Sequence, residues 1–159
     1  MSLPNKEKDD DTKRSVDAPV DFCIVHDEEF LFRAVPDYPN FFREDGSVSS
    51  AALKDGRGGV SVDRDGGRTD EEAISFFCET QNHLVQKGLK TTLVKYPVFL
   101  KIKTLDVRQN GCDVDPKPIT EGVVNPYHAE ITQNGTGKLK NSIAKKIVDM
   151  VSKIQNTIN

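Results

Sequence analysis

One helix start is clearly marked in the sequence, and it divides the chain into two parts. Thr69 can act as an N-cap, and Glu72 follows at the three-residue spacing of a capping box, with two more acidic residues between them where the helix dipole favours negative charge. Apolar residues then recur at helical spacing as far as Leu84, and Gly88 is a typical helix end. A helix is therefore predicted over residues 70–87.

Short β-strand patterns precede this helix and are joined by short turns. They cover residues 30–35 and 60–63, while 19–25 fits a short strand or a strand-like lead-in and 47–53 fits either a strand or a short helix. A parallel pair of strands needs a crossover connection of roughly a dozen residues or more, which such turns do not supply. The sheet is therefore predicted to be mixed or mainly antiparallel.

The second part of the chain adds strand patterns and one more helix. Strands are predicted at 91–94, 98–105 and 125–131, and a helix at 139–154, where apolar residues share one face. Residues 113–126 contain three prolines and a glycine, which indicates an extended connection with little regular structure. The fold class predicted is a single α+β domain with two main helices.

Length and composition set the domain limits and exclude several classes of protein. The 159 residues suffice for one hydrophobic core. We expect a flexible charged tail at 1–18 and the folded domain at 19–159, because the first 18 residues contain almost nothing apolar. No run approaches the roughly 18 apolar residues of a membrane span, and no signal peptide is evident. A cytoplasmic protein without a membrane partner is expected.

Cysteine usage and charge bear on cofactors and partners. Three widely separated cysteines, outside any C-x-x-C spacing, favour reduced thiols over disulfides or a cysteine zinc site. A net charge of −3 gives no general reason to expect a nucleic-acid partner. A protein partner is compatible with this composition, and the sequence identifies neither a cofactor nor a metal.

Five residues are candidates for a functional site: Arg33, Ser49, Ser50, His128 and Glu130. Arg33 shares a strand face with apolar residues, so its guanidinium must reach water or find an acceptor. His128 and Glu130 share a face of a later strand by the two-residue period. We predict that these two strands are neighbours, that Arg33 pairs with Glu130, and that the serines lie near His128.

A pattern across these segments resembles a group of small bacterial and phage-associated proteins. The pattern consists of the strand with Arg33, the segment DGSVSSAALKD, the GGVSVDRDG turn, a DVDPKP connection and NPYHAEI near the end, and it covers about residues 30–131. Pro36 and Val60 depart from it, since a His and a Leu are usual there. The resemblance implies one domain and singles out Arg33, the two serines and His128, but it implies no reaction.

Three interpretations of function remain open. The first is an interaction or accessory module in which the five residues form a buried polar network. The second is a nucleotide-acting enzyme that is loosely similar to ADP-ribosyltransferases in its Arg, Ser and Glu layout, although nearly eighty residues separate Ser50 from Glu130. The third is a metal-dependent hydrolase that uses His128, Glu130 and Asp113 or Asp115, for which no ligand motif is present.

Overall fold

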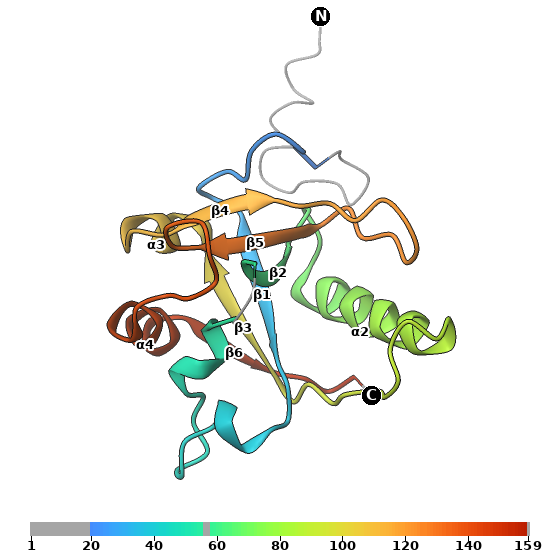
Figure 1. Ribbon diagram of the computed structural model, residues 1–159, viewed down its shortest axis with the longest axis horizontal. Helices are drawn as coiled ribbons and strands as arrows, with labels where there is room; N and C mark the ends of the chain where they lie inside the picture. Colours follow the sequence, from blue (N-terminus) through green and yellow to red (C-terminus); the bar gives the residue numbers. More distant parts are fainter. Residues whose placement is uncertain (1–19, 56–57, 159) are drawn as a thin grey trace, which may run out of the picture.

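The computed structural model describes residues 20–55 and 58–158 (Figure 1). The tail predicted at 1–18 therefore lies outside the described residues. The α+β class is confirmed, with two main helices on one antiparallel sheet. The helices and strands, in chain order, are β1 (Phe30–Val35), β2 (Val60–Arg64), α2 (Asp70–Gln86), β3 (Val98–Lys103), α3 (Thr104–Gln109), β4 (Asp113–Pro116), β5 (His128–Thr132), α4 (Asn141–Met150) and β6 (Ser152–Gln155), with short 3-10 helices η1 (Pro39–Phe41) and η2 (Ser50–Leu53) between β1 and β2.

The six strands lie in the order β4-β5-β2-β1-β3-β6, and each neighbouring pair is antiparallel. β1 pairs along its whole length with β3, from Phe30 opposite Lys103 to Val35 opposite Val98. Its pairing with β2 is shorter and is confined to Leu31 opposite Arg64 and Phe32 opposite Asp63. β1 is thus fully paired with β3 on one side and only briefly paired with β2 on the other.

Helices cover both faces of the sheet (Figure 1). The larger core lies under α3 and α4, where Leu31, Leu100 and Ile131 from the strands pack with Ile147 from α4. The smaller core lies under α2 and is built around Phe99 with neighbours from β1 and α2. Alternation along the strands divides the side chains between these two cores, as the two-residue period requires.

The helix predicted at 70–87 is confirmed, including its cap. The Thr69 hydroxyl accepts from the backbone N–H of Glu72 at 3.1 Å, and the Glu72 carboxylate accepts from the N–H of Thr69 at 2.8 Å. Within the second part of the chain the boundaries differ more. β3 ends at Lys103 instead of Leu105, because α3 begins at Thr104.

The helix predicted at 139–154 was wrong at its C-terminal end. α4 stops at Met150, and Ser152–Gln155 forms β6 along the free side of β3. The helical spacing of apolar residues continues to Ile154, but pairing with β3 makes Ser152–Gln155 a strand. Ile154 thereby packs against the smaller core under α2.

The remaining predictions of local structure have mixed outcomes. Residues 20–25 are not a strand, and the carbonyls of Asp21 and Ile24 accept hydrogen bonds from the buried Arg64. Residues 91–94, predicted as a strand, are not in regular secondary structure. The connection predicted at 113–126 begins with β4, which pairs with β5. Residues 50–53 form η2, one of the two alternatives for that segment.

Candidate functional site

Arg33 is used to hold the backbone together where β1 and β2 separate. Its Nε donates to the carbonyl of Ala52 and its Nη1 to the carbonyl of Ser61, both at 2.9 Å. The expectation that this guanidinium must find an acceptor is confirmed, since two carbonyls serve. Burial lowers the pKa of Arg33, and nearby Asp55 partly offsets that effect.

Ser49 and Glu130 have separate local partners, and Ser50 is the first residue of η2. Ser49 caps η2, accepting from the N–H of Ala51 and donating to the carbonyl of Asn40. Glu130 accepts from the backbone N–H of Gly59 at 3.2 Å. The placement of the Arg33 and His128 strands as neighbours was wrong, because β2 lies between β1 and β5. Among the described residues, no hydrogen bond or ion pair joins Arg33 to Glu130 or either serine to His128.

His128 has one ring nitrogen fixed by the backbone. Its Nδ1 lies 2.8 Å from the carbonyl oxygen of Lys117. A carbonyl oxygen only accepts, so Nδ1 must carry the proton, and in the neutral ring Nε2 is then a hydrogen-bond acceptor. The backbone of the loop before β5 therefore sets the tautomer of His128.

β2 places a second titratable residue directly opposite His128. Asp63 pairs with His128 in the register of β2 with β5, so the two side chains leave the sheet on the same face. Asp63 is 4% exposed. Burial raises the pKa of the Asp63 carboxyl, against the opposing effects of Asn125, His128 and Arg68.

Only one of the two carboxylate oxygens of Asp63 is satisfied. Asn125 donates from Nδ2 to Oδ1 of Asp63 at 2.9 Å, and its own Oδ1 accepts from the N–H of Tyr127. Oδ2 of Asp63 is buried and has no hydrogen-bond partner among the described residues. A buried polar atom without a partner costs free energy, so such an atom at a cavity wall suggests a binding role.

A cavity of about 380 Å³ opens over Asp63 and His128. It lies on the α2 face of the sheet, between α2 and the loop that precedes β5, and Figure 1 shows this loop reaching over the helix. Phe32 and Asp63 belong to its sheet side, Phe77 to α2 and Ile119 to the loop. We call this cavity the Asp63 pocket. Its size falls within the range of about 300–1,000 Å³ typical of ligand sites.

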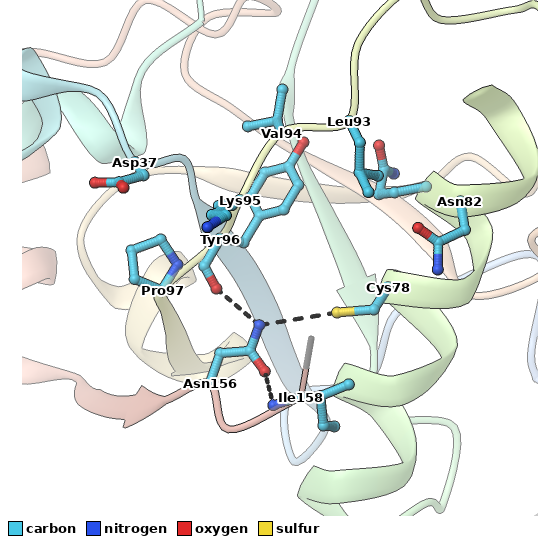
Figure 2. Close-up of a pocket in the computed structure, with 11 residues that line it drawn as sticks. Asp37, Cys78, Asn82, Leu93, Val94, Lys95, Tyr96, Pro97, Asn156 and Ile158 are labelled. Carbon is cyan, nitrogen blue, oxygen red and sulfur yellow. Dashed lines mark hydrogen bonds between the residues drawn. The ribbon is translucent and has the colours of Figure 1, made fainter.

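A second cavity of about 480 Å³ lies against the same turns of α2, where Cys78 and Asn82 line it (Figure 2). Gln81 and Tyr96 line both cavities. Asn156 closes one side of the second cavity by donating to the carbonyl of Tyr96 at 2.8 Å and contacting Sγ of Cys78 at 3.9 Å. Among the described residues, no buried side-chain atom that lacks a partner lines this cavity, so it offers less for specific recognition.

Asp63 and Asn125 were missed as candidates from the sequence. The alternation of Val60, Val62 and their neighbours places Asp63 on the face opposite the larger core, where a charged residue is ordinarily solvent-exposed. Its burial depends on α2 and on the loop before β5, which are remote in sequence. The Asn-Pro-Tyr-His stretch was noticed, and Asn125 within it could have been recognised as a residue that anchors a loop.

Comparisons with known proteins identify no relative of this chain. No family model, no curated protein and no solved structure matches this chain. In the described part of the chain, no helix is both long and apolar enough to cross a membrane. Within 20–55 and 58–158, no group of three or more His, Cys, Asp or Glu side chains could hold a metal ion.

Proposed function

We propose that the protein is a small accessory module that binds a small polar molecule in the Asp63 pocket. The observation that carries this proposal is Oδ2 of Asp63, a buried acceptor without a partner at the wall of a cavity of ligand size. Leaving such an atom unpaired costs roughly 1–3 kcal/mol, and a ligand N–H or O–H group would recover that cost.

The surroundings of Asp63 support a prepared site. Asn125 holds Oδ1, and the carbonyl of Lys117 holds the ring of His128, so neither side chain has to reorganise when a ligand enters. Sites held by such supporting contacts lose less free energy on binding than mobile ones. The cavity walls combine apolar side chains with a few polar groups, which is the usual composition of a ligand pocket.

The two enzyme interpretations have less support. An ADP-ribosyltransferase-like role needs an arginine that is available to phosphates, whereas Nε and Nη1 of Arg33 already bind carbonyls. The carboxylate expected to stabilise the developing charge in that reaction, Glu130, accepts from the backbone N–H of Gly59. A metal-hydrolase role needs a ligand set, and the described residues offer no group of three suitable side chains.

The proposal is tested with a fragment library and one isosteric variant. Ligand-observed NMR with the whole protein should find compounds that bind the wild type, and Asp63→Asn should abolish or strongly weaken their binding. Asp115→Asn makes the same charge change at an exposed position on the edge strand β4 and should leave binding unchanged. If every binding compound retained its affinity for the Asp63→Asn variant, the pocket would not be the site.

A further inference from the structure

We propose that the Asp63 pocket recognises an uncharged aromatic heterocycle through its exocyclic amino group, as adenine or cytosine would present it. This inference rests on the proposed function and specifies its ligand class. The amino group would donate one N–H to Oδ2 of Asp63 and the other to Nε2 of His128.

The hydrogen-bonding groups at the base of the pocket determine this choice. Oδ2 of Asp63 is an acceptor without a partner, and Nε2 of His128 is an acceptor because Nδ1 donates to Lys117. Residues directly opposite on antiparallel strands have Cβ atoms about 4.5–5.5 Å apart, so both acceptors rise from neighbouring points of the sheet. An exocyclic amino group carries two N–H donors on one nitrogen, which matches two acceptors side by side.

The walls of the pocket suit a flat ring. Phe32, Phe77 and Tyr96 line it together with Leu84 and Ile119. Phe77 is held by edge-to-face contacts with Tyr96 at 5.0 Å and Phe99 at 5.5 Å between ring centroids. Aromatic and apolar side chains of this kind hold bases by stacking while polar groups read the base edge.

The charges that line the pocket favour an uncharged ligand over a cationic amine. Arg33 and Lys90 line it, and so do Asp63 and Glu121, so the two signs balance. Lys90 lies in the wall beside Tyr96 and donates to Oε1 of Gln81 at 2.5 Å. Because these charges balance, the lining offers no net attraction to a cationic amine, and a neutral amino group supplies the two donors without adding a charge to the pocket.

Matched pairs of nucleosides test the role of the amino group. Adenosine differs from inosine, and cytidine from uridine, by an amino group in place of a carbonyl oxygen. Isothermal titration of the full chain should show adenosine or cytidine binding about tenfold or more tighter than its oxo counterpart, because a carbonyl would face two acceptors. Circular dichroism of the Asp63→Asn and Asp115→Asn variants, which are compared with the wild type, establishes that each is folded.

The Asp63→Asn variant should reverse the direction of this discrimination. Its amide oxygen can keep the bond from Asn125 while its NH₂ replaces Oδ2, so it donates where the wild type accepts. The amino-to-oxo affinity ratio should fall to about one or below, as expected when a site's donor and acceptor are exchanged. Asp115→Asn should keep the wild-type ratio.

The remaining outcomes separate the ligand class from the pocket itself. Equal binding of amino and oxo nucleosides by the wild type would overturn the amino-group inference. Binding of none of the four, alongside a library fragment whose binding depends on Asp63, would overturn the ligand class and leave the proposed function standing. If neither nucleosides nor fragments bound, both proposals would fail.

Discussion

The Asp63 carboxylate combines burial, a neighbour that holds one oxygen, and a second oxygen that has no partner among the described residues. Residues that serve only the fold rarely keep such an arrangement, because replacing the group would stabilise the protein. Residues that bind a ligand keep it in spite of that cost. Stability and binding should therefore respond in opposite directions to a change at this position.

Asp63→Asn should raise stability at neutral pH. Burial raises the folded-state pKa above the ordinary value of 3.8, so the stability linked to this group is fully present below the unfolded-state pKa and is lost as pH rises through the raised folded-state pKa. Asparagine is uncharged at every pH and avoids that loss, so the variant should be more stable than the wild type at pH 7.

Urea titrations of wild type and Asp63→Asn at neutral and acidic pH check this sign. The gap between their unfolding free energies should narrow as pH falls, because Asp63 then becomes protonated. A variant that is less stable than the wild type at neutral pH would show that the charged carboxylate supports the fold, and it would weaken the assignment of Asp63 to ligand binding.

Arg33→Ala should destabilise the protein without involving any ligand. The change removes the donors that satisfy the carbonyls of Ala52 and Ser61, and hydrogen bonds from a charged donor contribute about 1.5–3 kcal/mol each. Urea denaturation should show a loss of about 2–4 kcal/mol in the free energy of unfolding. Arg33→Lys should lose less, because it keeps a charged donor. An unchanged midpoint would instead indicate that these two carbonyls find other donors.

At the scale of elements, sequence patterns predicted the long or sharply marked segments and missed the short ones. The Thr69 cap and the alternation of Phe30–Val35 are local signals, and both elements form where predicted. β4 and β6 have four residues each, and they exist because a neighbouring strand had a side free to pair. That requirement is set by the whole sheet, so a local pattern does not contain it.

The candidate site, like the short strands, depends on the strand order of the whole sheet. His128 could be predicted because it is a titratable residue on a predicted strand, and in the structure it lines the wall of a cavity. The predicted cluster around Arg33 assumed that β1 and β5 are adjacent, whereas β2 separates them. Asp63 sits on that intervening strand, so knowledge of the strand order was needed to place it beside His128.

The turn between β2 and α2 depends on a glycine packed against an aromatic ring. Gly66 has φ +60°, and a Cβ there would lie 2.3 Å from Cε1 of Tyr127. That ring is itself held, since the guanidinium of Arg68 stacks on it at 3.6 Å and Phe76 meets it edge-on. The ring therefore has little freedom to move aside.

Gly66→Ala should cost roughly 3 kcal/mol, because backbone strain and a clash with a fixed ring add together. Gly88→Ala is the matched control: it has a similar φ of +73° with nothing within 4 Å, so only the strain of about 1 kcal/mol should appear. Chemical denaturation of both variants measures the difference. Equal losses at the two positions would mean that Tyr127 yields to the added methyl group.

At the scale of the whole molecule, a buried ion pair attaches the chain before β1 to the sheet. Nε and Nη2 of Arg64 donate to the Glu29 carboxylate at 2.8 and 2.9 Å, and the same guanidinium binds the carbonyls of Asp21 and Ile24. Both charged side chains are almost fully buried. This contact holds residues 20–29 in place without strand pairing.

Glu29→Gln should therefore destabilise the whole domain by about 3–5 kcal/mol, because it leaves the Arg64 charge buried without its counter-ion. Asp27→Asn is the control within the same segment: its pair with Arg108 is at the surface, with the Asp27 side chain 56% exposed, so a loss of about 0–1 kcal/mol is expected. Guanidinium denaturation would report the first loss as a lower midpoint of one cooperative transition, with hydrogen exchange accelerating across β1 and β2 together. Exchange that accelerates only in residues 20–29, with the midpoint unchanged, would show that the buried pair supports this segment alone and not the sheet beneath it.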